Sequence, residues 1–457
     1  MATLSAGVIA VTQVVPFCAS AFAHERDFDD GPDDQDNSGH GNADDFDDFD
    51  LDDSSGHGSG QDDDHDFDDD HGADQDNSGH GNGDNFDDND HHDDNDHTSD
   101  RSGHNDGNDE YDAPFIAEEV IYSVEYDSHG GEFVPGEIVF VGRAQDLAQA
   151  LNSGFSEISV QNLASGGVMA RLGLPPRGVT MEAALVQLSE LAPDAIATPN
   201  NIYRSAQAVR ASVSRTTTRR TARPRGTLGV IDTGVDGSSM ADSLLSQRAF
   251  AGPTPVARDH GSMVASIAVA RGVRVHVADV FGHSMDGGLA ASAERIAAAL
   301  DWMIAHRIAV VNISVEGPDN AVLAEMVRRA AERGHIIVAA AGNGGPAARP
   351  SFPAAFDGVL AVTAIDESDR PYVRANRGDY IDFAAPGVDI NVDVNGSMAR
   401  VSGTSFAAPV IAAEAAAHLH APSPAESARV LTNLRARAED LGAPGRDNIF
   451  GWGALRD

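Results

Sequence analysis

The chain has almost no cysteine and no long apolar run, and each lack excludes a class of protein. Cys18 is the only cysteine among 457 residues, so no disulfide can form within the chain. No uninterrupted apolar stretch reaches the ~20 residues that a membrane-spanning helix needs. Basic residues are also scarce, because 31 Lys and Arg face 72 Asp and Glu for a formal net charge of −41. That balance argues against nucleic acid as the main partner.

Charge of either sign is missing from the first 23 residues. Their apolar stretch ends in Ala-Phe-Ala at 21–23, just before a polar segment, as in a secretory signal. We therefore expect a signal peptide over 1–23 and a secreted, periplasmic or extracellular location. No basic residue precedes the apolar core, so an upstream start or a buried N-terminal strand remain the alternatives. Cys18 would leave with the signal.

Most of the acidity belongs to residues 24–112, which carry 33 Asp and 2 Glu against two Arg, whereas residues 113–457 net only −8. The segment is rich in Asn, Gly, His and Ser, and DQDNSGHGN occurs at both 34–42 and 74–82. Burial of so few apolar residues cannot offset the entropy lost on ordering the chain. We therefore predict that this segment is disordered. Carboxylates suit Ca²⁺, which makes the segment a candidate calcium binder. A solvated spacer is the alternative.

Residues 113–203 change to patterned sequence and predict a small α+β unit without a catalytic-looking cluster. We expect strands over 132–142 and 195–204 and helices over 146–154 and 179–191. Residues 204–225 then carry seven Arg and no acid, together with many Ser and Thr. This composition predicts an exposed linker and a zone for proteolytic cleavage.

From residue 226 onward, short apolar strands alternate with long helices. The strands are expected over 226–232, 273–281, 308–314 and 335–342, and helices over 290–307 and 321–334. The alternation predicts an α/β fold with βαβ units around a parallel sheet. In such sheets the chemistry gathers beyond the carboxyl ends of the strands.

Three residue types needed for nucleophilic hydrolysis lie in this region. Asp232 ends a strand in VIDTGVD, His260 stands in DHGSMVA, and Ser405 opens an Ala-rich helix in SGTSFAAP. A hydroxyl nucleophile needs an imidazole base and a carboxylate that orients it. Asn343 in AAAGNGG follows another strand, and its amide could donate to a developing oxyanion.

Each motif alone has a structural explanation. A lone Asp caps turns, a lone His is more often a buried structural residue, Gly-Thr-Ser caps helices, and Asn-Gly forms turns. The order Asp, His, Ser favours the catalytic interpretation, because it matches subtilisin and differs from chymotrypsin and the α/β-hydrolases.

Residues 226–457 thus resemble the subtilase family of serine proteases. DTGVD, HGSMVA, AAGNGGPAARPSFPAAF, GTSFAAP and a closing GRDNIFGWGAL occur in order. The resemblance implies a subtilisin-like three-layer domain with a central parallel sheet, and a serine endopeptidase that acts on peptide or protein substrates without a cofactor or a catalytic metal. It implies a triad of Asp232, His260 and Ser405, with Asn343 and the backbone amide of Ser405 as the oxyanion hole.

The same resemblance assigns the substrate-binding edge strand to Ser314, Val315, Glu316 and Gly317. Glu316 stands where many members carry Gly, which leaves the specificity open, and Met263 stands where many carry a second His. Phe352-Pro353 matches the position of a cis proline. The calcium-binding loop that the family inserts before the strand at 273 is absent, so that calcium site is not expected.

Residues 113–203 resemble the inhibitory prodomain found ahead of many subtilases. The resemblance implies a secreted zymogen, with the prodomain as the chain's own inhibitor and cleavage in or just before the linker. A permanently attached accessory domain is the alternative for this unit. For the whole chain the alternatives are a non-catalytic binding scaffold, with the acidic segment as its working part, and a peptidase that acts only on itself.

Overall fold

The computed structural model describes residues 119–176, 178–205, 209–212, 225–394 and 397–456. The predicted signal peptide, the acidic segment and most of the Arg-rich linker lie outside the described residues. Within these ranges, no helix combines the length and the apolar character that crossing a bilayer requires.

A sheet of seven parallel strands forms the centre of the C-terminal part, in the order β17-β16-β15-β13-β8-β10-β9. The strands are β8 (Gly226–Asp232), β9 (Leu244–Ala249), β10 (Val273–Asp279), β13 (Val310–Ile313), β15 (Ile336–Ala340), β16 (Val359–Ile365) and β17 (Ile381–Pro386). Burial on both faces explains why the central strands are apolar throughout rather than alternating.

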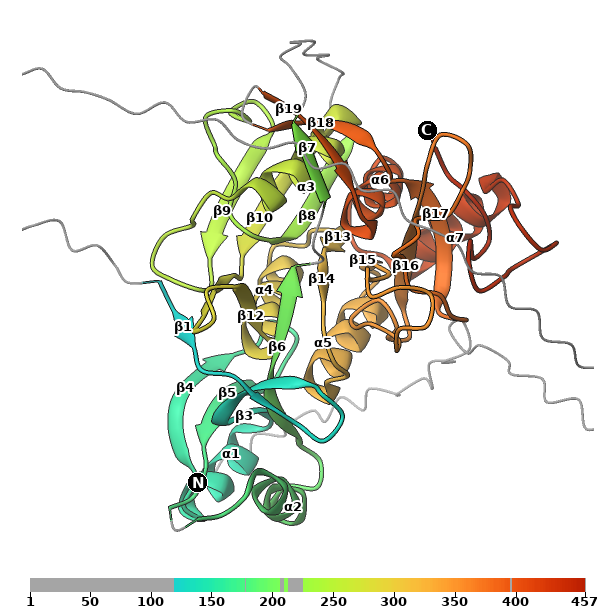
Figure 1. The fold of residues 1–457 in the computed structure, drawn as a ribbon. Coiled ribbons are helices and arrows are strands. Elements are labelled where there is room, and N and C mark those ends of the chain that lie inside the picture. The colour runs from blue at the N-terminus through green and yellow to red at the C-terminus, as the bar shows by residue number, and fades with distance from the viewer. Residues whose placement is uncertain (1–118, 177, 206–208, 213–224, 395–396, 457) are drawn as a thin grey trace, which may run out of the picture. The chain divides into compact units, whose positions relative to one another are not determined.

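Helices cover both faces of this sheet (Figure 1). One layer holds α3 (Asp259–Ala270) and α6 (Thr404–Ala416), the other α4 (Ala293–Ala305) and α5 (Ala321–Glu332), and α7 (Pro424–Arg437) lies against α6. Neighbouring residues of β8 divide between the layers, because Val230 packs with α3 and α6 whereas Ile231 packs with α4 and α5. The expected three-layer α/β fold is confirmed.

An antiparallel sheet precedes this part, in the order β6-β3-β5-β4. Its strands are β3 (Glu132–Gly142), β4 (Ser156–Asn162), β5 (Val168–Gly173) and β6 (Ile196–Ser205), with helices α1 (Ala144–Asn152) and α2 (Met181–Leu191). Phe140 packs beneath α1 and α2, whereas Val139 and Val141 pack against α4 and α5. The N-terminal unit (residues 132–205) is therefore seated on one helical layer of the C-terminal part.

Two asparagines of β6 reach the N-termini of the helices beneath them. Asn200 Oδ1 accepts from the backbone N–H of Glu294 in the first turn of α4 at 3.2 Å. Asn320, which caps α5 through the Leu323 N–H at 3.0 Å, donates to Asn201 Oδ1 at 2.8 Å. The N-terminal unit thus satisfies helix-end groups that would otherwise need another partner.

The C-terminal end of β6 leaves its own sheet and lies between β12 (Leu289–Ser292) and β14 (Val315–Glu316), as Figure 1 shows. It pairs antiparallel with both, Tyr203 opposite Ala291 and Ser205 opposite Val315. The remaining short strands are β1 (Ile121–Tyr122), β2 (Glu125–Tyr126) and β11 (Gly282–Ser284), and a separate small sheet holds β18 (Ile390–Val394), β19 (Ser397–Ser402) and β7 (Val209–Ser212).

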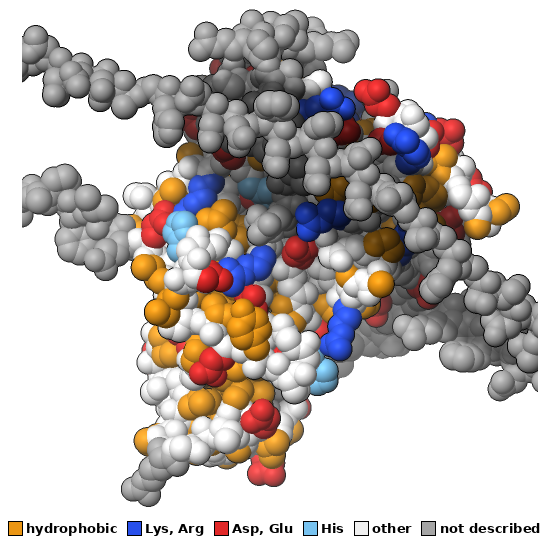
Figure 2. Space-filling model, in the orientation of Figure 1, with side chains coloured by type: hydrophobic (Ala, Val, Ile, Leu, Met, Phe, Trp, Pro, Cys, Tyr) orange, Lys and Arg blue, Asp and Glu red, His pale blue; other side chains and the backbone are white. Residues whose placement is uncertain are grey.

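On the face shown in Figure 2, acidic and basic side chains lie interspersed over the described surface. This mixture agrees with the small net charge of residues 113–457 and contrasts with the composition of residues 24–112.

Asp301 on α4 stabilises the turn between β4 and β5, and its replacement should make that turn less stable. Its two carboxylate oxygens accept the backbone N–H groups of Ala164 at 2.8 Å and Ser165 at 3.0 Å. Asp301→Ala leaves both donors without an acceptor, at about 1–3 kcal/mol each. We expect these two amides to exchange hydrogen about 10- to 100-fold faster. Asp301→Asn, which keeps one acceptor, should expose only one of them, and unchanged exchange at both would contradict the assignment.

Candidate active site

The parallel order of the central sheet brings three polar segments to one edge. β8 ends at Asp232, and the chain continues from β13 into Ser314 and from β15 toward Asn343. Because β8, β13 and β15 are neighbours, these residues are gathered at their carboxyl ends.

Asp232 and His260 form a direct contact. Asp232 Oδ1 lies 2.8 Å from His260 Nδ1 and also accepts the Thr233 backbone N–H at 2.7 Å. Both residues are buried, Asp232 completely. The carboxylate can therefore favour the tautomer with the proton on Nδ1. In this tautomer Nε2 is free of a proton of its own and can accept one.

The start of α3, which carries His260, packs tightly against the end of β8. Thr233 Oγ1 accepts the Gly261 backbone N–H at 2.9 Å. A Cβ at Gly261 would lie only 2.3 Å from the Thr233 carbonyl oxygen, so glycine is required for this approach. The packing fixes the position of the imidazole relative to Asp232.

Ser405 is the second residue of α6 and is fully buried. The next residue, Phe406, lies with its ring centroid 5.8 Å from that of His260. Ser314 Oγ donates to the Ser405 carbonyl at 3.4 Å and in turn accepts from Asn312 Nδ2 at 2.8 Å. The structure thus brings the N-termini of α3 and α6 together over the ends of β8 and β13.

The side chain of Asn343 is oriented by Thr404. Asn343 Oδ1 accepts from the Thr404 backbone N–H at 3.0 Å and from its hydroxyl at 3.1 Å. These bonds fix which side of the amide is oxygen, so Nδ2 points away from Thr404. Nδ2 is buried and has no hydrogen-bond partner among the described residues. A buried donor without an acceptor costs about 1–3 kcal/mol, so it is suited to an acceptor supplied from outside.

The predicted edge strand, residues 314–317, is paired on one side by the chain itself. Val315 and Glu316 form β14, opposite Ser205 and Arg204 of β6. Gly317 exchanges two backbone hydrogen bonds with Phe352, each 3.1 Å long, and the Phe352–Pro353 peptide bond is cis. Met263, also singled out in the sequence, is buried in α3.

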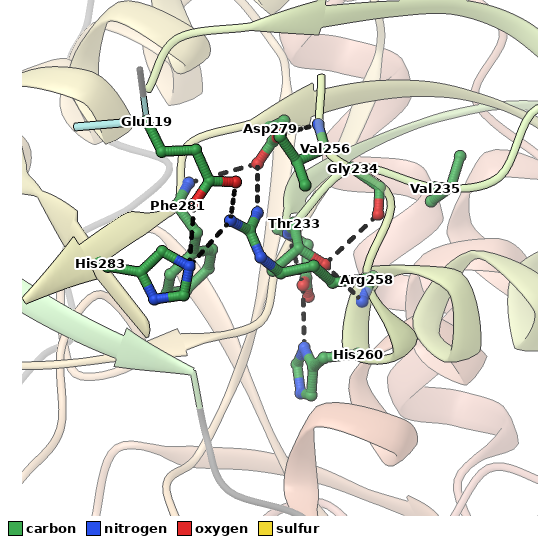
Figure 3. A network of polar contacts seen from close by, with 12 residues as sticks. Glu119, Thr233, Gly234, Val235, Val256, Arg258, His260, Asp279, Phe281 and His283 are labelled. Atoms are coloured by element: carbon green, nitrogen blue, oxygen red, sulfur yellow. Dashed lines mark hydrogen bonds and ion pairs between the residues drawn. The ribbon is translucent and has the colours of Figure 1, made fainter. Parts of the chain in front are cut away.

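Sequence patterns missed the polar network beside His260 that Figure 3 shows. Arg258 donates to Glu119 at 2.7 Å and lies 4.0 Å from Asp279, and its backbone N–H donates to Gly234 at 3.0 Å. His283 contacts the other Glu119 oxygen at 2.9 Å. Glu119 lies two residues before β1, so the network also connects this N-terminal strand to the edge that holds Asp232 and His260. Thr233 and Thr404 were likewise missed, although both lie within the quoted motifs.

Asp279 at the centre of this network has a strongly shifted pKa. Burial raises the pKa of its carboxyl to about 6, against an ordinary 3.8. The Val256 N–H, which donates to it at 2.7 Å, and the nearby Arg258 offset only part of the burial.

No group of three or more His, Cys, Asp or Glu side chains in the described part of the chain is placed to hold a metal ion.

The chain is similar to a known protein family and to several known proteins. The subtilase family model matches residues 226–453. Subtilisin Savinase from Lederbergia lenta is 30% identical over 245 residues, which cover 50% of this chain and 87% of Savinase. Minor extracellular protease Epr from Bacillus subtilis is 38% identical over 160 residues, 34% of this chain and only 25% of Epr. The chain therefore spans a quarter of the length of that longer relative.

A solved structure extends the likeness of the fold beyond the C-terminal part. Fervidolysin from Fervidobacterium pennivorans, described as a keratinolytic enzyme related to subtilisin, superposes with a TM-score of 0.59 and 20% identity. The match covers 74% of this chain and 62% of fervidolysin.

The raised pKa of Asp279 should make stability fall as the pH rises. The folded chain keeps this proton up to about pH 6, whereas the unfolded chain releases it near pH 4, a difference of about 3 kcal/mol. The contribution is complete below pH 4 and is lost above pH 6. Asp279→Asn stays neutral, so it should gain stability relative to the parent between pH 4 and 7. Urea unfolding at four pH values, with Ser405→Ala in both chains, measures this; a constant difference would contradict it.

Proposed function

The chain belongs to the subtilase family of serine proteases, and on this premise we propose that it is a serine endopeptidase made as a secreted zymogen. The observation that carries the proposal is the buried Asn343 Nδ2, which Thr404 holds next to Ser405 and which has no hydrogen-bond partner within the described ranges. Such a donor has little structural use, and a developing negative charge is the acceptor it fits.

In the proposed reaction, Ser405 Oγ attacks the carbonyl carbon of the substrate peptide bond. His260 Nε2 takes the hydroxyl proton and later gives it to the leaving amine, while Asp232 stabilises the imidazolium that forms. The 2.8 Å contact between Asp232 and His260 supports this assignment. Water then hydrolyses the acyl-enzyme by the reverse proton path, and the chemistry needs no cofactor.

Asn343 Nδ2 and the backbone amide of Ser405 would stabilise the oxyanion. The orientation of Asn343 does not depend on the substrate, because the two bonds from Thr404 hold it in advance. Preorganised donors of this kind cost no rearrangement at the moment of reaction.

We propose that the N-terminal unit is the chain's own inhibitor. Support comes from β6, whose last residues pair with β12 on one edge and β14 on the other. Tyr203 is fully buried there, and its hydroxyl donates to the Pro318 carbonyl at 2.8 Å. A peptide substrate would bind by the same strand addition, so β6 and substrate exclude one another.

The same pairing narrows the proposed cleavage zone. Ser205 pairs with Val315, and Val209 pairs with Ser402, three residues before Ser405. The chain is thus paired with β14 just before residues 206–208, and with the strand that leads into Ser405 just after them. We therefore propose that self-cleavage falls between Ser205 and Val209, at the start of the predicted linker rather than at its arginines.

The first 112 residues enter the proposal from their sequence alone. We propose that residues 1–23 direct export and that the carboxylates of 24–112 bind Ca²⁺ outside the cell. Compaction of this segment on addition of Ca²⁺ would test the second part.

Ser405→Ala should abolish both covalent labelling and self-processing, because no other hydroxyl replaces the nucleophile. We expect a fluorophosphonate probe to label the parent chain but not the variant. Intact-mass measurement should find a new N-terminus between residues 206 and 209 only in the parent. Ser368→Ala, at an exposed serine, is the matched control and should behave as the parent. Labelling that persists in Ser405→Ala would refute the assignment, and an unlabelled parent would favour a non-catalytic scaffold.

Asn343→Leu keeps the size of the side chain but removes the proposed oxyanion donor. We expect kcat to fall about 100- to 1,000-fold, with KM much less affected, because the bond forms mainly in the transition state. Thr404→Val removes one of the two bonds that orient the amide and should cause a smaller loss. Steady-state kinetics on a peptide substrate measures both variants. A rise in KM as large as the fall in kcat would show that the bond acts in ground-state binding instead.

A further inference from the structure

A carboxylate lies directly beside the proposed oxyanion donor. Glu316 stands on β14, and its Oε2 accepts the Asn343 backbone N–H at 3.0 Å. Residues 314–317 and the turn that holds Asn343 continue the neighbouring strands β13 and β15. The Glu316 side chain therefore reaches across from one of these segments to the other.

Two further contacts lie near this carboxylate. The backbone bonds between Gly317 and Phe352 close the end of the edge strand. Tyr380 donates its hydroxyl to the Ala341 carbonyl at 2.9 Å; burial raises the pKa of its phenol, and the nearby charge of Glu316 adds to this rise. A substrate side chain lying between the two segments would meet the Glu316 carboxylate.

The charge of Glu316 is poorly compensated within the described part of the chain. Burial raises the pKa of its carboxyl, and the Asn343 N–H, Arg374 and His260 offset this only in part. No ion pair of 4 Å or less to Glu316 is found there, and its one hydrogen bond to a described residue is the bond that Oε2 accepts from Asn343. Arg204, its partner in register on β6, instead directs its guanidinium to Glu132 at 2.7 Å. Burying an unpaired charge is costly, and a cation from outside would offset that cost.

The substrate residue that supplies this cation follows from the reaction geometry. The reacting carbonyl must lie against Asn343 Nδ2, and the backbone N–H of Asn343 is bonded to Glu316. The substrate residue that contributes this carbonyl group is therefore the one nearest to the Glu316 carboxylate.

We propose that Glu316 is a specificity-determining residue that selects substrates with a cationic side chain on the N-terminal side of the cleaved bond. The inference rests on the proposed function. A guanidinium matches a carboxylate with two parallel hydrogen bonds, so arginine is preferred to lysine.

Self-cleavage need not follow this preference. The proposed zone holds Ala206, Gln207 and Ala208, none of them basic. Because strand pairing holds the chain on both sides of that zone, its effective concentration at Ser405 replaces recognition by a side chain.

The test compares peptide substrates that differ only in the residue before the cleaved bond: arginine, its neutral isostere citrulline, or alanine. For the protein expressed from the full chain and allowed to process itself, we expect kcat/KM for arginine to exceed that for citrulline by about 10- to 100-fold. Glu316→Gln keeps the size and the acceptor for the Asn343 N–H but loses the charge, so this ratio should fall to about one. Glu367→Gln, at an exposed carboxylate, removes the same charge and should keep the parent's ratio.

A parent ratio near one, an unchanged ratio in Glu316→Gln, or faster cleavage after alanine than after arginine would each overturn the inference. The last result would mean that Glu316 only fills the space. Fluorophosphonate labelling of the parent separates the two levels of the argument. Labelling and turnover without arginine preference reject only the role of Glu316, whereas a parent that is neither labelled nor active rejects the proposed function as well.

Discussion

The hydrogen bonds on both edges of β6 join the N-terminal unit to the C-terminal part. One end of this strand belongs to the N-terminal sheet through β3, and the other fills the gap between β12 and β14. β14 has only two residues, so without β6 its backbone groups on that side would face solvent or another chain. Inhibition and substrate binding, as proposed, then use the same donors and acceptors, and the occupant of that edge determines the state of the protein.

Several incompletely satisfied polar groups lie at the same edge of the central sheet. Among the described residues, Asp232 Oδ2 and Asn343 Nδ2 are buried without a hydrogen bond, and Glu316 is a partly buried carboxylate without an ion pair. Each costs stability in the free chain, and the well-packed sheet and helices around them must offset that cost. Departures from good packing chemistry of this kind are expected where a protein binds and transforms a ligand.

Much of the fold could be predicted from the sequence wherever burial is two-sided or the helix is long. β3 and β8 have the predicted bounds, β3 because its alternating pattern is typical of a strand and β8 because its apolar run is buried in the centre of the sheet. The helix predicted over 290–307 begins only at residue 293, because Ala-Ala-Ser at 290–292 has no strong preference and joins β12 through pairing with β6. For the site, motifs indicated the candidate residues but not Thr404 or Arg258, whose roles depend on neighbours distant in sequence.

The all-parallel arrangement of the central sheet also has a consequence for the order of folding. Every pair of neighbours in it is joined by a crossover, so its contacts link residues far apart in sequence, whereas β4 and β5 are joined by a short turn. Chains dominated by distant contacts fold slowly, and N-terminal segments leave the ribosome first. The N-terminal unit is thus expected to form early and to offer Asn200 and Asn201 as a template on which α4 and α5 nucleate.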